Sequence, residues 1–75
     1  MKCTIRLIWS DESRSWHCES DDIPGLVLGS DSFDTLVERI LLAAPEMLEL
    51  NCNYTGPIDL SFESERVDSL SALVS

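Results

Sequence analysis

Apolar residues recur at every second position in two stretches near the start of the chain. A period of two is typical of a β-strand with one buried face, so we expect strands over 3–9 and 15–19, joined by a polar turn. The apolar positions that define these strands are Cys3, Ile5, Leu7, Trp9, Trp16 and Cys18. Two hairpin registers keep these side chains on one face of the sheet: one opposes Leu7 to Trp16, and the other opposes Trp9 to Trp16.

Residues 20–25 contain a Pro-Gly pair, the strongest turn signal in the chain, and predict a loop. Residues 26–29, with the sequence Leu-Val-Leu-Gly, predict a short third strand at a sheet edge. Farther along, apolar residues alternate with acidic residues and serine, which predicts a fourth strand over 58–63 with one polar face. For residues 64–75, a helical turn and a frayed terminus both fit the sequence.

A helical stripe is the clearest periodic signal of the chain. Apolar residues follow the spacing of one helix face at Phe33, Leu36, Val37, Ile40, Leu41 and Ala44. Asp31 or Ser32 can cap the N-terminus of this helix, and Asn51 is the expected C-cap. Pro45 cannot donate a backbone hydrogen bond, so we expect either a kink or a stop followed by a second short helix.

The elements therefore follow the order β-β-β-α-β. We expect an α+β fold in which an amphipathic helix covers one face of a small antiparallel sheet. At 75 residues the chain is expected to form a single domain over 1–75, with 64–75 as a loosely ordered tail.

The charge of the chain limits its partners. Acidic residues outnumber basic ones 14 to 5, which gives a formal net charge of −9. Such a surface repels nucleic acid and anionic membranes, so neither is an expected direct partner. A basic protein partner, or simply high solubility, is favoured instead. We see no secretory signal and no apolar run long enough to cross a membrane, and we expect a cytoplasmic protein.

The reactive side chains do not form a known catalytic or metal-binding pattern. Cys3, Cys18 and Cys52 are odd in number and widely spaced, which indicates neither a zinc site nor redox chemistry. We expect the only histidine, His17, on the exposed face of its strand rather than as a catalytic base. The acidic cluster suits turn and cap chemistry, and it also suits an acidic patch for a basic partner; it comprises Asp21, Asp22, Asp31 and Asp34. No catalytic residue, metal site or cofactor is expected.

Part of the sequence resembles a known family. The resemblance is carried by Trp-Ser-Asp-Glu at 9–12, by Trp16, by Ser-Asp-Asp-Ile-Pro-Gly-Leu at 20–26, and by the helix ending over 44–51. These segments are similar to small bacterial domains of unknown function in the HicB-like antitoxin superfamily, over residues 3 to 62. The resemblance implies a partial ribonuclease-H-like fold with sheet order 3-2-1-4. It also implies an antitoxin-like role, the masking of a small basic toxin that degrades messenger RNA. HicB proteins usually carry a C-terminal DNA-binding segment, but 64–75 is too short and too acidic for one, so operator binding is not expected.

Three functional hypotheses follow. The preferred one is a non-enzymatic interaction domain that binds a small basic, toxin-like protein, with the contact residues Trp9, Asp11, Glu12, Trp16, Asp21 and Asp22. The alternative is a stand-alone structural module that forms a homodimer or higher homo-oligomer and has no toxin partner. The least favoured is a degenerate metal-dependent nuclease that uses Asp59 and Glu38, because the first strand lacks the carboxylate that such chemistry needs.

Overall fold

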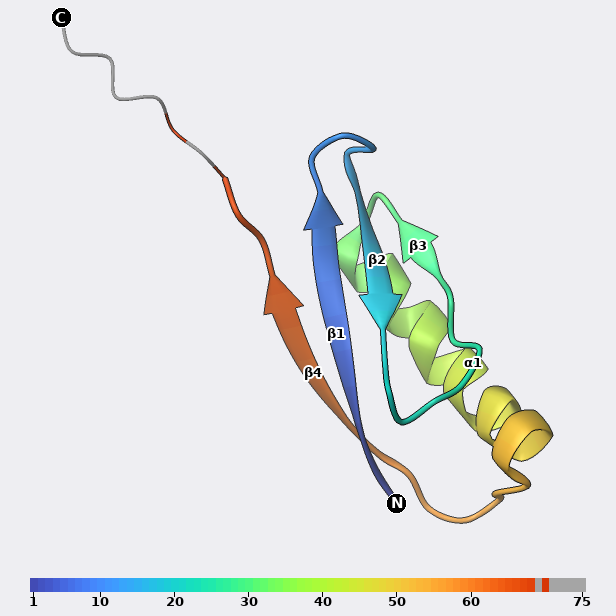
Figure 1. Cartoon of the computed structure of the whole chain (residues 1–75). Coiled ribbons are helices and arrows are strands. Elements are labelled where there is room, and N and C mark those ends of the chain that lie inside the picture. Colours follow the sequence, from blue (N-terminus) through green and yellow to red (C-terminus); the bar gives the residue numbers. More distant parts are fainter. Residues whose placement is uncertain (69, 71–75) are drawn as a thin grey trace, which may run out of the picture.

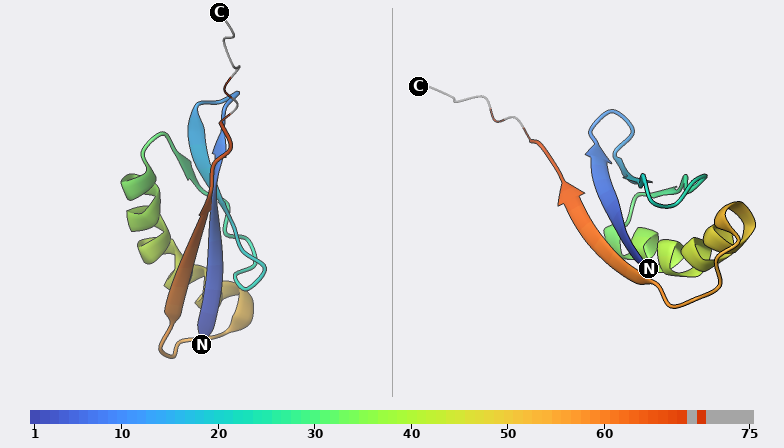
Figure 2. Two further views of the ribbon diagram at one scale, coloured as in Figure 1. Left: turned by 90° about the vertical axis from the view of Figure 1, so that its left-hand side faces the viewer. Right: turned by 60° about the horizontal axis from the view of Figure 1, so that its bottom comes forward.

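The computed structural model describes residues 1–68 and 70, which form four strands and one helix (Figure 1). In chain order these are β1 (Lys2–Ser10), β2 (Ser15–Glu19), β3 (Gly29–Ser30), α1 (Phe33–Cys52) and β4 (Asp59–Glu65). The strands form one sheet in the order β3-β2-β1-β4, and α1 packs on one face of it (Figure 2). The α+β fold and the strand order 3-2-1-4 are confirmed.

The sheet is mixed rather than antiparallel, which corrects the sequence prediction. β4 runs parallel to β1, whereas the other two pairings are antiparallel. The cause is the route of α1, which carries the chain back across the sheet face to the end where β1 begins (Figure 1). There the N–H of Asp59 donates to the carbonyl of Met1 at 2.8 Å, and β4 then runs in the direction of β1. β4 also extends to Glu65, beyond the predicted limit. Of the segment 64–75, for which a helical turn and a frayed terminus both fitted the sequence, residues 69 and 71–75 lie outside the described residues.

The hairpin adopts the register that opposes Trp9 to Trp16 and Leu7 to Cys18. Its turn contains Arg14 in the left-handed conformation, with a φ of 52°. The Arg14 guanidinium also lies 3.0 Å from the carboxylate of Asp11 across the turn.

The third strand differs from the prediction. β3 contains Gly29 and Ser30, whereas Leu26 lies in the preceding loop and is buried in the core together with Ile23. Gly25, at a φ of 81°, occupies a conformation that L-residues rarely adopt, and it lies directly before Leu26. The predicted span of 26–29 was therefore wrong at its start, because Leu26 belongs to the preceding turn, where its N–H donates to the carbonyl of Ile23 at 3.3 Å.

The helix begins where expected and continues through Pro45. The hydroxyl of Ser32 accepts a hydrogen bond from the N–H of Thr35, so Ser32 is the N-cap. A stop at Pro45 was the wrong alternative, since α1 is unbroken to Cys52 and its left-handed C-cap is Asn53 rather than Asn51. Ala44 and Leu48, on either side of Pro45, are both fully buried. Their packing holds the last turns of the helix on the core despite the lost hydrogen bond.

The core lies between α1 and the inner face of the sheet. It combines alternate residues of β1 and β2 with one stripe of the helix and the loop before β3, namely Cys3, Ile5, Leu7, Cys18, Ile23, Leu26, Leu36, Ile40, Ala44 and Leu48. Within the described residues, no helix combines the length and apolar character that a membrane crossing requires.

Candidate interaction surface

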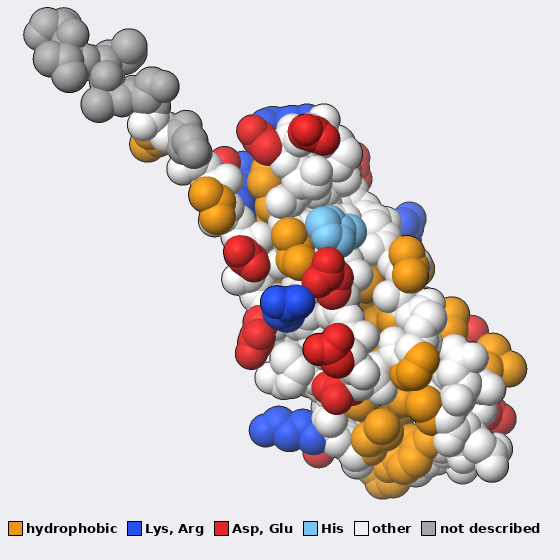
Figure 3. Space-filling view, viewed as in Figure 1, with side chains coloured by type: hydrophobic (Ala, Val, Ile, Leu, Met, Phe, Trp, Pro, Cys, Tyr) orange, Lys and Arg blue, Asp and Glu red, His pale blue; other side chains and the backbone are white. Residues whose placement is uncertain are grey.

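The sheet face opposite α1 is not covered by the helix, and the charged side chains of the strands gather on it. We call it the open face. The strand register places the side chains of Glu19, Arg6 and Glu63 in one row across β2, β1 and β4. Asp59 and Glu65 extend the acidic character along β4, since they share the face of Glu63. Figure 3 shows acidic side chains gathered over this face, with few basic ones among them. We call Asp59, Glu63 and Glu65 the β4 carboxylates.

The arginines of the chain are occupied by internal partners. Arg6 pairs with Glu19 at 3.0 Å, Arg14 with Asp11 at 3.0 Å, and Arg66 with Asp68 at 2.8 Å. Arg39 donates to the carbonyl of Gly29 at 3.0 Å. These pairs are about half exposed or more, so each stabilises the fold only slightly. Within the described part of the chain, the β4 carboxylates have no ion-pair partner.

The structure does not bring the six predicted contact residues together. Asp11 and Glu12 lie at the tip of the β1–β2 hairpin, whereas Asp21 and Asp22 lie in the loop at the far end of β2. Asp22 also has a local structural task, since its carboxylate accepts the N–H of Thr4 at 2.7 Å. Asp21 lines a shallow cavity of about 360 Å³ on the open face.

The two tryptophans lie on the side of the sheet that faces α1. Trp16 contacts Trp9 and Phe33 edge to face, with ring centroids 5.4 and 5.0 Å apart respectively. The guanidinium of Arg66 lies 4.3 Å from the centroid of the Trp9 ring, and that of Arg14 lies 5.5 Å from it. Both tryptophans are half-buried, and both contact other side chains of the same chain. They are packing residues at the end of the core, and they are separate from the acidic face.

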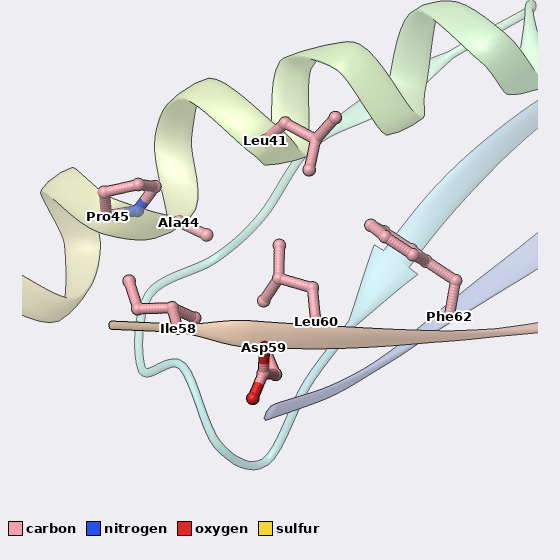
Figure 4. Close-up of a pocket in the computed structure, with 7 residues that line it drawn as sticks. All are labelled: Leu41, Ala44, Pro45, Ile58, Asp59, Leu60 and Phe62. Carbon is pink, nitrogen blue, oxygen red and sulfur yellow. The ribbon is translucent and has the colours of Figure 1, made fainter. Parts of the chain in front are cut away.

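Sequence reasoning missed an apolar groove between α1 and β4 (Figure 4). The helix backbone approaches β2 and β3 most closely, which leaves the inner face of β4 only partly covered. The resulting groove has a volume of about 310 Å³, and its apolar lining comprises Leu41, Ala44, Pro45, Ile58, Leu60 and Phe62. Ile58, Leu60 and Phe62 point towards the helix, whereas Asp59 points away from it (Figure 4). Leu41 was expected in the core stripe, but its side chain is 52% exposed at this groove.

The residues considered for chemistry are scattered. Asp59 lies on the outer face of the sheet and Glu38 is exposed on α1, so the sheet separates the two carboxylates of the nuclease hypothesis. His17 lies on the open face, as expected, 3.9 Å from Glu19. Burial raises the pKa of the Cys3 and Cys18 thiols, which keeps them protonated and poorly nucleophilic. Cys52 is exposed and is the last residue of α1.

Fold and surface together define a small acidic α+β domain with an open, charged sheet face. The chain belongs to the family DUF1902, a domain of unknown function, whose model matches residues 2–73. It is also similar to the crystal structure of the hypothetical protein TTHA1013 from the extremely thermophilic bacterium Thermus thermophilus. The two share 28% sequence identity and superpose with a TM-score of 0.79, over 93% of this chain and 100% of the other. No curated protein matches the chain.

Proposed function

We propose that this domain is a non-enzymatic, cytoplasmic interaction domain that binds a small basic protein through the open face of its sheet. The role is antitoxin-like, as the resemblance to HicB-like domains implies, and the partner is a toxin ribonuclease. The observation that carries the proposal is the set of β4 carboxylates, which remain unpaired within the described residues while the four arginines are engaged within the chain.

Charge and buried contacts would have different effects on binding at such a surface. Long-range attraction to a basic protein accelerates encounter, and this acceleration falls as salt screens the charges. Affinity then depends on groups that become buried in the complex. The three cysteines are free thiols, which suits a reducing compartment such as the cytoplasm.

Affinity capture from a lysate of the source organism tests the proposal. The bait is applied at low salt, eluted at high salt, and the eluate is identified by mass spectrometry. The informative variant is Glu63→Lys with Glu65→Lys, which reverses charge on the open face. Its matched control is Glu46→Lys with Glu49→Lys, which makes the same change of net charge at exposed positions of α1.

We expect the wild type and the α1 control to retain the same small basic protein in stoichiometric amount, and the β4 variant to lose it. Equal loss in both double variants would show that net charge, and not the open face, governs capture. Recovery of the bait alone under all conditions would contradict the proposal.

A second candidate function is a homo-oligomeric structural module without a toxin. It is favoured by exposed leucines on α1, where the side chains of Leu41, Leu42 and Leu50 are 52%, 76% and 79% exposed. Light scattering on the purified protein separates the two. A concentration-independent homo-oligomer that captures no basic protein would support the module, whereas a monomer would exclude it.

A further inference from the structure

β4 is an exposed edge strand of unusual length for so small a sheet. It runs for seven residues, from Asp59 to Glu65, and among residues 1–68 and 70 only β1 lies beside it. The opposite edge, β3, has two residues. An edge strand presents a row of backbone N–H and C=O groups that another strand can pair with. The edge that can accept a further strand is therefore β4.

The two sides of this edge differ in chemistry. Side chains of an added strand would point alternately to the two faces of the sheet. On the inner face they would enter the groove beside Leu41 and Pro45, where Leu60 and Phe62 are only half-buried. On the outer face they would lie next to the β4 carboxylates, within the distance of a directly opposed pair. The edge thus fits a strand in which apolar and basic residues alternate.

A second copy of this chain fits the edge poorly. If β4 paired antiparallel with β4 of another copy at full overlap, Asp59 would lie opposite Glu65 at both ends. A shift of two residues would place Glu63 opposite itself or opposite Asp59. Like charges that face each other directly across two strands are destabilising. The carboxylates therefore disfavour self-pairing and leave the edge open to a basic strand.

We propose that β4 binds an extended segment of the partner as a fifth strand of the sheet, and that this segment alternates Lys or Arg with Val, Ile or Leu. The inference rests on the proposed function, which it deepens by naming the binding edge and the pattern of the ligand. Backbone hydrogen bonds to β4 contribute affinity, and the groove and the carboxylates select the two kinds of side chain.

The test uses the full chain and a fluorescent peptide in which Lys alternates with Val. The control peptide has the same composition, with the Lys and Val residues grouped rather than alternating. Affinity is measured by fluorescence polarisation at low and high salt, and backbone amide exchange is followed by NMR. The groove variant is Leu41→Asp, and its control is Leu42→Asp, which changes a neighbouring leucine that does not line the groove. Thermal unfolding confirms that both variants are folded, and Leu41→Ser replaces Leu41→Asp if that variant is not.

We expect the alternating peptide to bind at least about tenfold more tightly than the control peptide, and Leu41→Asp to weaken it by about tenfold or more while Leu42→Asp does not. Amides of β4 should become protected from exchange in the complex. Equal affinity of the two peptides, or protection elsewhere, would overturn the fifth-strand inference. If capture of the basic protein requires Glu63 and Glu65 but is unchanged by Leu41→Asp, the fifth-strand inference fails and the proposed function stands. If lysate capture yields no basic protein that depends on the β4 carboxylates, the proposed function fails.

Discussion

Replacing Pro45 with alanine should stabilise the domain, because the residue lies well inside α1 and leaves the carbonyl of Leu41 without its helical donor. Proline in a helix interior costs about 3 kcal/mol relative to alanine. The stabilisation gained by removing the proline is partly offset, because alanine gives the unfolded chain more conformational freedom. This freedom lowers the free energy of unfolding by about 0.4–1 kcal/mol. The ring also packs in the groove, but Pro45 is exposed, so its lost contacts cost about 0.8 kcal/mol at most.

The net effect of Pro45→Ala is an increase of about 1–2 kcal/mol in the free energy of unfolding, which for a domain of this size corresponds to about 5–15 °C in Tm. Urea and thermal unfolding followed by circular dichroism measure both quantities. The control is Leu42→Ala, an exposed change on the same helix that should alter stability by less than about 0.5 kcal/mol. An unchanged or lower Tm for Pro45→Ala would refute the reasoning, because it would mean that the ring stabilises the groove by more than the helix loses.

Three further predictions concern the core. Ile40→Ala removes a fully buried side chain and should destabilise the domain by about 2–5 kcal/mol in urea unfolding, against a near-neutral Leu42→Ala. A thiol reagent should modify Cys52 rapidly in the native protein and reach Cys3 and Cys18 only on unfolding; rapid reaction of all three would contradict the packing. Burial raises the pKa of Cys3 and Cys18 in the folded state, so the folded protein favours their protonated form. Their contribution to the free energy of unfolding is therefore fully present below the unfolded pKa of about 8.5 and is lost as pH rises above it. Urea unfolding at increasing pH should show this fall, and a variant with both cysteines replaced by alanine should lack it.

The order of elements could be predicted because each has a strong local signal. The alternation on either side of the first turn identifies the hairpin, and the spacing from Leu36 to Ala44 identifies the helix. The choice between two hairpin registers depended on the turn, and an arginine at position 14 does not indicate a left-handed conformation. The direction of β4 depended on the path of α1 across the sheet, which is a tertiary property. Pro45 likewise shows that tertiary packing limits prediction from local sequence. The packing of Ala44 and Leu48 in the core overrides the local signal that would end the helix at the proline.

The candidate surface was harder to predict, because it depends on which strands are neighbours. Asp21 and Asp22 stand out in the sequence as consecutive acids, yet Asp22 supports the backbone of β1. Glu63 and Glu65 look like ordinary exposed strand residues until the parallel pairing places them beside Arg6 and Ile8. The groove has a faint sequence signal, because Leu41 and Pro45 lie one helical turn apart on the edge of the apolar stripe. Its existence follows from the offset of α1 towards β2 and β3, which local patterns do not encode.

Three departures from good local structure meet at the edge of β4. A proline interrupts the hydrogen bonds of α1, the longer edge strand of the sheet has no second neighbour among the described residues, and the aromatic ring of Phe62 is only half-covered. Each has a cost in stability, and a chain of this size has little stability to lose. Natural sequences tend to keep local and global preferences consistent except where function requires otherwise. These departures coincide at the strand whose carboxylates have no ion-pair partner among the described residues. This coincidence supports the proposal that a partner would bind at this edge rather than at the tryptophans of the hairpin end.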